Sequence, residues 1–379
     1  MSLSPYAGAP FGYFDSGPTP PNGIVELMPG ARSLMDYLQV ASGERVLILT
    51  EHVVDPVVIQ ATAAAAAYRG ADVHILSVPA YSAGGWDREV PSPLVPAIYP
   101  EADVVISFAW WPEVHSGPLF FGIVFQNRAR MVSVSQTATA AAFITAARFP
   151  EELYYAIGRK ARERLASCKQ LRITTEQGTD VTVSDLGRID ADEGPLEPHG
   201  WRPWPFGGVN FNPVRTDGVL VIEESTVTGF TDEPVRVELK DNAVAAIEGG
   251  EAARQLRTFS PGGYYVRHAV LGLNPKARVA RAAQFEREKH AGIFYLGLDG
   301  LVDGAQNRMR PGFAHCDCLF VRPNVFTDGA PLVEKGRLLL LEDPDIREIA
   351  AGFGPPEVLL DASPTVVLPP RFMNRTVSV

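Results

Sequence analysis

The sequence predicts an α/β N-terminal domain with a parallel sheet, followed by a β-rich α+β C-terminal domain. In the first half, the apolar runs Arg45–Thr50 and Asp72–Val78 flank an Ala-rich helical segment, residues 56–69, that ends at Gly70. Such runs are typical of buried parallel strands in a β-α-β unit. After about residue 170, polar and apolar residues alternate between tight-turn residues, which indicates an antiparallel sheet.

Further elements continue these two patterns along the chain. Asp103–Phe108 and Arg130–Val134 repeat the apolar strand pattern of the first half. Glu151–Ser167 has the amphipathic pattern of a long helix that bridges two domains. In the second half, Pro275–His290 is the one clear helix that we expect.

Length and composition suit this organisation and exclude several classes of protein. A chain of 379 residues is long enough for two domains, which we expect at residues 1–160 and 161–379, the second being β-rich. The net charge of −10 offers no basic surface to a nucleic acid, and the sequence has no apolar run of about 18 residues that would span a membrane. Three cysteines are too few for a disulfide framework. We therefore expect a reduced, cytoplasmic protein, and a homo-oligomer.

The most informative tetrapeptide is His315-Cys316-Asp317-Cys318. The apolar LFV that follows it indicates a strand, in which successive side chains point to opposite faces. His315 and Asp317 then share one face, and the two cysteines share the other. Side chains about 7 Å apart along a strand can converge on a metal ion, although an isolated His-x-Asp pair is more often part of an ordinary strand.

A second histidine on a predicted strand favours a metal site over an ordinary strand. His268 lies in the alternating segment YYVRHAVLGLNP. Two histidines and one carboxylate make the facial triad that binds Fe(II) and leaves coordination positions open. We therefore predict that His268, His315 and Asp317 ligate one divalent metal ion, which requires that their strands lie close together.

The chain resembles the aminopeptidase T family of metallopeptidases over most of its length. The matching segments are AAYRGADV (66–73), EQGTDVTV (176–183), DGVLVIEESTVTG (217–229), DNAVAAIEGGEA (241–252), AVLGLNPKA (269–277), AHCD (314–317) and FTDG (326–329). Three metal ligands of the peptidases are changed. Val219 stands at one glutamate position, His268 stands at another, and the histidine expected just before Gly297 is missing. The two-metal hydrolytic site has thus lost ligands, whereas the His-x-Asp pair persists.

The altered pattern is similar to that of the 2,5-dihydroxypyridine 5,6-dioxygenases, which are relatives of these peptidases. That family uses a mononuclear Fe(II) held by two histidines and one aspartate. The resemblance implies that His268, His315 and Asp317 hold Fe(II) here. It also implies a small hydroxylated aromatic substrate, O2 as the second substrate, and an open-chain N-formyl amide acid as the kind of product.

Three further residues are implied by the same resemblance. His115, followed by Ser116, corresponds to a His-Ser pair that borders the substrate, and Glu176 lies near an acidic position of the family. His199, beside two tryptophans, would belong to a proton relay. Each is a candidate acid–base group for ring cleavage. The alternative interpretations are a loop histidine, a turn carboxylate and a surface histidine.

Two other functions remain open from the sequence. The first is an aminopeptidase T-like metallohydrolase with Zn or Mn, in which Glu223 and Glu224 would be substitute ligands. The second is a non-catalytic metal-binding protein. Metal analysis, combined with assays of O2 consumption and amide hydrolysis, separates the three classes.

Overall fold

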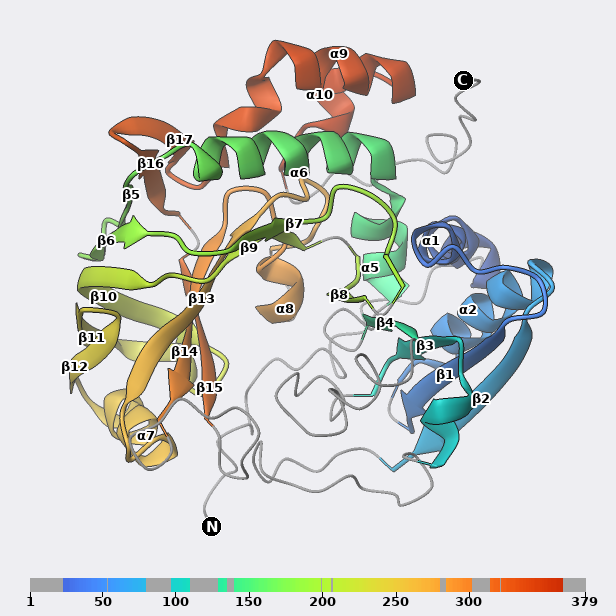
Figure 1. Ribbon diagram of the computed structural model, residues 1–379, viewed down its shortest axis with the longest axis horizontal. Coiled ribbons are helices and arrows are strands. Elements are labelled where there is room, and N and C mark those ends of the chain that lie inside the picture. The colour runs from blue at the N-terminus through green and yellow to red at the C-terminus, as the bar shows by residue number, and fades with distance from the viewer. Residues whose placement is uncertain are drawn as a thin grey trace.

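The computed structural model of the chain contains two β-sheets with helices around them (Figure 1). It describes residues 23–52, 54–79, 97–109, 129–134, 140–198, 200–205, 207–279, 284–301, 314–320 and 322–363. The N-terminal sheet is parallel, and the C-terminal sheet is antiparallel. The predicted fold class is therefore confirmed.

The parallel sheet has the strand order β2-β1-β3-β4-β8 among the described residues. Its strands are β1 (Arg45–Glu51), β2 (Asp72–Val78), β3 (Val104–Ser107), β4 (Arg130–Ser133) and β8 (Trp201–Pro203). Alternate residues pack into different cores: Ile48 joins the main core, whereas Leu49 and Met131 join a smaller one on the other face. Burial on both faces explains the apolar runs of β1, β3 and β4, whereas β2, at the edge of the sheet, is largely exposed.

Helices α1 (Ile24–Tyr37) and α2 (Pro56–Tyr68) pack on each other beside this sheet (Figure 1). The Asp55 side chain begins α2 by accepting a hydrogen bond of 2.9 Å from the backbone amide of Val57. Gly70, with a φ of 80°, follows the end of the helix. No helix in the described part of the chain is long and apolar enough to cross a lipid bilayer.

The antiparallel sheet contains thirteen strands within the described residues. They are β5 (Leu171–Thr174), β6 (Asp180–Asp185), β7 (Ile189–Ala191), β9 (Gly208–Phe211), β10 (Arg215–Ser225), β11 (Gly229–Lys240), β12 (Ala243–Glu248), β13 (Tyr264–Gly272), β14 (Phe294–Gly300), β15 (His315–Phe320), β16 (Asn324–Thr327), β17 (Ala330–Glu334) and β18 (Arg337–Leu338). The order β11-β12-β13-β14-β15-β10 is closed by a further pairing of β10 with β11. These six strands therefore form a ring, in which β14 lies between β13 and β15.

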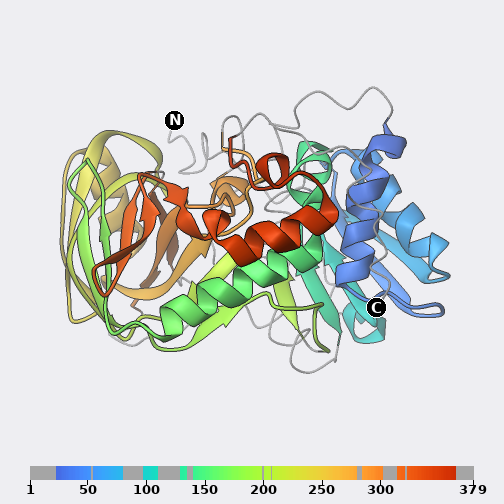
Figure 2. The same ribbon diagram turned by 90° about the horizontal axis from the view of Figure 1, so that it is seen from above.

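Helix α6 (Glu151–Ala166) confirms the helix that the amphipathic pattern predicts, and it packs on β7 and β9 of the antiparallel sheet (Figure 1). Figure 2 shows helix α9 (Pro344–Phe353) lying along α6. The Lys160 ammonium group lies 2.6 Å from a carboxylate oxygen of Asp343 and 2.7 Å from one of Asp345. Because Asp343 also caps α9 through its side chain, these contacts hold α9 against α6.

The chain crosses between the two sheets more than once. After α6 it enters the antiparallel sheet, returns to the parallel sheet as β8 beside β4, and re-enters the antiparallel sheet as β9. Trp204, between β8 and β9, is fully buried against Phe143. The Asp192 carboxylate accepts hydrogen bonds of 3.0 Å from the Tyr37 hydroxyl and the Arg202 guanidinium, which fastens this crossing to α1.

The helix predicted at Pro275–His290 is wrong in its extent. Within the described residues, this segment is helical only at α8 (Gln284–Arg287). The backbone amide and the guanidinium of Arg278 both donate hydrogen bonds to the carboxylate of Glu286. The two residues therefore lie side by side. These two residues would be about 12 Å apart in a continuous helix. The C-terminal half instead gains three helices that we did not predict: α7 (Glu251–Phe259), α9 and α10 (Pro356–Leu359).

Glu151, at the start of α6, leads to a prediction about stability. Desolvation raises the pKa of its carboxyl group to about 8, although the Ser33 hydroxyl donates a hydrogen bond to it at 2.9 Å. The folded chain thus favours the protonated form, so wild-type stability should fall as the pH rises from about 5 to about 8. Glu151→Gln stays neutral throughout. Its melting temperature relative to wild type should therefore rise over that range in scanning calorimetry, and a constant difference would contradict the raised pKa.

Candidate metal centre

Three residues form one row across strands β13, β14 and β15. His268 pairs with Gly297, and Gly297 pairs with Asp317. Paired residues of antiparallel neighbours point to the same face of the sheet, so the side chains of His268 and Asp317 project from one face with a glycine between them. His315, two residues before Asp317 on β15, shares this face. We call it the metal face.

A β-bulge turns His268 toward the metal face. Val266 pairs with Leu298, and the next pair along β13 is His268 with Gly297. Between these pairs β13 contains one residue more than β14. Val266 belongs to the hydrophobic core, and by simple alternation His268 would point into that core as well. The additional residue at Arg267 reverses the alternation, as bulges beside functional sites do.

The missing side chain of Gly297 makes room for the imidazole of His268. A Cβ atom on Gly297 would lie 2.2 Å from Cε1 of that ring and 2.6 Å from each ring nitrogen. The imidazole therefore lies over the backbone of β14. Because neighbouring strands are about 4.8 Å apart, side chains from β13 and β15 can meet only above an empty position on the strand between them.

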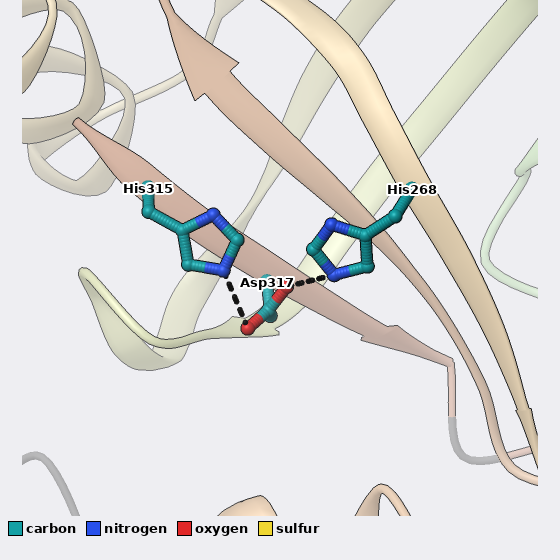
Figure 3. A group of neighbouring side chains, drawn as sticks. All are labelled: His268, His315 and Asp317. Carbon is teal, nitrogen blue, oxygen red and sulfur yellow. Dashed lines mark hydrogen bonds and ion pairs between the residues drawn. The ribbon is translucent and has the colours of Figure 1, made fainter. Parts of the chain in front are cut away.

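The three candidate ligands point toward one another (Figure 3). Nε2 of His268 lies 3.1 Å from Oδ1 of Asp317, and Nε2 of His315 lies 3.1 Å from Oδ2 of the same carboxylate. The two imidazole rings are stacked, with centroids 5.3 Å apart and planes inclined by 18°. All three residues are buried, and one ligand atom from each lies within 4.8 Å of the others.

Asp299 on β14 fixes the orientation of His315. Its fully buried carboxylate accepts a hydrogen bond from Nδ1 of His315 at 2.6 Å. The Tyr265 hydroxyl, at 3.4 Å, and the Arg267 guanidinium, at 3.7 Å, contact the same carboxylate. Nε2 of His315 is thereby directed toward Asp317. This is the arrangement in which a second carboxylate orients a metal-binding histidine.

The charge balance of the cluster favours a cation. Burial lowers the pKa of His315, but the carboxylates of Asp317 and Asp299 outweigh burial and raise it to about 10. Burial acts to raise the pKa of Asp317, but His315 and His268 outweigh it and hold that pKa below its usual range. The two buried carboxylates thus stabilise positive charge beside them. A divalent ion can supply this charge in place of a proton.

The opposite face of β15 carries both cysteines. Cys316 and Cys318 are fully buried in the hydrophobic core, and their sulfur atoms are 3.9 Å apart with both thiols free. Neither belongs to the candidate ligand group. The strand alternation predicted for this tetrapeptide is therefore confirmed.

Tyr295 lies in the next row of the metal face. It is paired with Val270 on β13 and with Leu319 on β15. Its ring stands at 87° to the imidazole of His268, with the ring centroids 5.6 Å apart. Burial raises the pKa of Tyr295 well above its usual range, and Glu288 and Asp317 add to the shift, so the hydroxyl group stays protonated.

Glu224, a substitute metal ligand in the hydrolase interpretation, has another partner. It pairs with Leu319 across β10 and β15, which places it on the metal face. Its buried carboxylate forms an ion pair with the guanidinium of Arg287, which also lies 5.0 Å from the centroid of the Phe230 ring. Among the described residues, the candidate ligand group includes neither Glu224 nor Glu223.

The structure describes one of the three predicted acid–base residues. Glu176 is exposed in the turn between β5 and β6. The Thr179 side chain anchors this turn to β10 through hydrogen bonds with the backbone of Val221. His115 and His199 lie outside the described residues. The roles of all three residues therefore stay predictions.

Sequence reasoning did not identify three features of the site. They are Asp299, the bulge in β13, and Gly297 as the residue above which His268 crosses β14. Alternation along FYLGLDG puts Gly297 and Asp299 on one face, and this signal could have linked the segment to the ligands. The bulge at Arg267 leaves no comparable signal, because YYVRHAVLG is equally compatible with a regular strand.

The donor set fits one divalent transition metal ion. Ligand atoms bound at about 2.1 Å and roughly at right angles are about 3 Å apart, which is close to the two separations of 3.1 Å. Two imidazoles and one carboxylate form the facial triad of non-haem Fe(II) oxygenases. In the part of the chain that the structure describes, only these three residues form such a group.

The fold is shared with two solved structures. The 2,5-dihydroxypyridine dioxygenase from Pseudomonas putida KT2440 has a TM-score of 0.65 and 20% sequence identity, over 83% of this chain and 97% of that one. Wild-type AmpT from Thermus thermophilus has a TM-score of 0.55 and 14% identity, over 83% of this chain and 99% of that one. Both structural relationships expected from the sequence motifs are therefore confirmed.

A family model gives a more specific assignment than the fold. Residues 26–340 match the model described as 2,5-dihydroxypyridine 5,6-dioxygenase. The chain belongs to this family. No curated protein matches the chain.

Gly297→Ala tests the crossing of β14 by His268. The added methyl group would occupy the position of the imidazole, so the ring must rotate away from Asp317. We expect metal affinity to fall by about 10- to 100-fold, as when a metal site loses its supporting geometry, while circular dichroism shows a folded chain. The control is Gly352→Ala, whose Cβ meets nothing within 4 Å. Unchanged metal affinity in Gly297→Ala would show that His268 does not cross above this glycine to reach the metal.

Proposed function

We propose that the chain is a mononuclear non-haem Fe(II) dioxygenase that cleaves a hydroxylated aromatic or N-heteroaromatic ring. The observation that carries the proposal is the buried group of His268, His315 and Asp317 in a member of the 2,5-dihydroxypyridine 5,6-dioxygenase family. Three protein ligands would leave about three coordination positions for the two substrates. When bound, Fe(II) would supply the activation of O2 next to the ring.

The residues around the triad would orient the ring and exclude water. Val270 and Leu319 are buried and lie on the metal face directly beside the ligand row. These two side chains make the surroundings of the ligand row apolar. Fixed orientation of two reactants and exclusion of water are the main contributions that a protein makes to such a reaction.

The surroundings of Glu224 favour a single metal ion over a two-metal hydrolytic site. Its carboxylate forms an ion pair with Arg287, which offsets the negative charge that it would offer to a second metal ion. At the position where the peptidases have a glutamate, His268 brings a neutral donor. The ligand set therefore carries one negative charge, which suits one divalent ion and an anionic substrate oxygen better than two ions.

Ring cleavage also requires that a proton leave the ring hydroxyl group and that a proton reach the opened product. An acid–base group must therefore lie within hydrogen-bond reach of the ring. We propose His115, Glu176 and His199 for this role, on the family correspondence of their positions.

Single alanine substitutions of the three ligands test the proposal. His268→Ala, His315→Ala and Asp317→Ala should each lower metal affinity by at least about 100-fold and abolish O2 consumption with 2,5-dihydroxypyridine, because a two-ligand site remains. The measurements are metal analysis after anaerobic purification and an oxygen electrode. His74→Ala is the control, since His74 is an exposed histidine in the parallel sheet. Full metal content and activity in His268→Ala would refute the triad.

His268→Glu separates the oxygenase from a hydrolase. The substitution restores the carboxylate found in the peptidases and adds a negative charge to the metal. An oxygenase should lose ring cleavage, because the charge and the reduction potential of the iron both change. A hydrolase should tolerate the change. Amide hydrolysis by the wild type with bound zinc, without O2 consumption, would also overturn the proposal.

A further inference from the structure

The side chain of Tyr295 is placed to meet a ligand of the metal centre. It projects from the metal face in the row adjacent to His268 and Asp317. Its ring packs edge-on against the imidazole of His268. The position is fixed from both sides by the strand pairs with Val270 and Leu319, so the phenol is held by rigid elements rather than by a loop.

The hydroxyl group of Tyr295 has no hydrogen-bond partner within the described residues. The residue is half-buried. Some polar atoms of the protein are buried without a hydrogen-bond partner, and the Tyr295 oxygen is not one of them. The hydroxyl therefore borders accessible space on the metal face. A Tyr hydroxyl at the edge of an apolar surface is normally satisfied by water or by a bound group.

The phenol ring of Tyr295 has its centroid 5.6 Å from that of the candidate ligand His268. It also lies between the apolar side chains of Val270 and Leu319, so a ring bound at the metal centre would lie beside it. An oxygen atom carried by that ring is the acceptor that would satisfy it. Hydrogen bonds in such weakly polar surroundings are stronger than those in water.

We propose that Tyr295 is a substrate-binding residue, whose hydroxyl group donates a hydrogen bond to an oxygen atom of a hydroxylated aromatic ring bound at the His268–His315–Asp317 centre. The inference rests on the proposed function for the kind of ligand, but not on turnover. The phenol ring also supports the imidazole of His268. The two contributions can be separated, because Tyr295→Phe removes the hydroxyl group and keeps the ring.

The test uses the full chain loaded with Fe(II) under anaerobic conditions, with 2,5-dihydroxypyridine as the probe. Tyr295→Phe should retain its metal content and melting temperature, because the packing on His268 is unchanged. Its dissociation constant for the probe, measured by calorimetric titration, should rise about tenfold or more, which is the effect of losing one hydrogen bond to a charged oxygen. Tyr68→Phe is the control, since that tyrosine is 87% exposed on α2.

The outcomes distinguish this inference from the proposed function. Weaker probe binding in Tyr295→Phe without any wild-type O2 consumption would support the inference and reject the dioxygenase. Normal wild-type turnover with unchanged probe binding in Tyr295→Phe would overturn the inference alone. Loss of metal in Tyr295→Phe would also overturn it, because the hydroxyl would then act through the metal site. A wild type that neither binds nor consumes the probe would overturn both.

Discussion

The geometry of the whole site depends on the imidazole of His268, which crosses a β-strand to reach the carboxylate of Asp317. His268 and Asp317 lie on strands separated by β14, so a direct approach of their side chains requires a gap in the strand between them. Gly297 provides the gap, and the bulge at Arg267 turns the imidazole to the correct face. Asp299 then orients the second imidazole from the same central strand. The central strand thus contributes no candidate ligand, yet it determines the geometry of all three.

The fold class could be predicted because the two halves of the sequence differ in pattern. Continuous apolar runs predict parallel strands, and alternating runs predict antiparallel strands, and both patterns follow from which faces are buried. The His-x-Asp pair could be predicted for a similar reason, because alternation separates it from the cysteines. The bulge could not be predicted, because it depends on the fit of neighbouring strands. The long helix predicted at Pro275–His290 is wrong because Arg278 contacts Glu286, eight residues further along the chain, and a continuous helix would keep these two residues apart.

The fold of this chain is similar to that of AmpT, although only 14% of the aligned residues are identical. The row of residues that holds the site is set by strand pairing, which depends on the backbone and on core packing. The ligand identities depend on single side chains at positions in that row. In this chain His268 and the Arg287–Glu224 ion pair set the charge available to a metal ion, whereas strand pairing sets the register of the sheet. This separation makes the fold a poor guide to the reaction and the donor set a better one.

The path of the chain through β8 has a consequence for how the protein can move. The strand at Trp201–Pro203 completes the parallel sheet, although the segments before and after it belong to the antiparallel sheet. The chain therefore crosses between the two halves more than once rather than through a single linker, and the buried Trp204 lies at one of these crossings. A hinge that opened one half against the other would have to pull a strand out of a sheet. Relative motion of the two halves is thus restricted, and the two sheets depend on each other for their integrity.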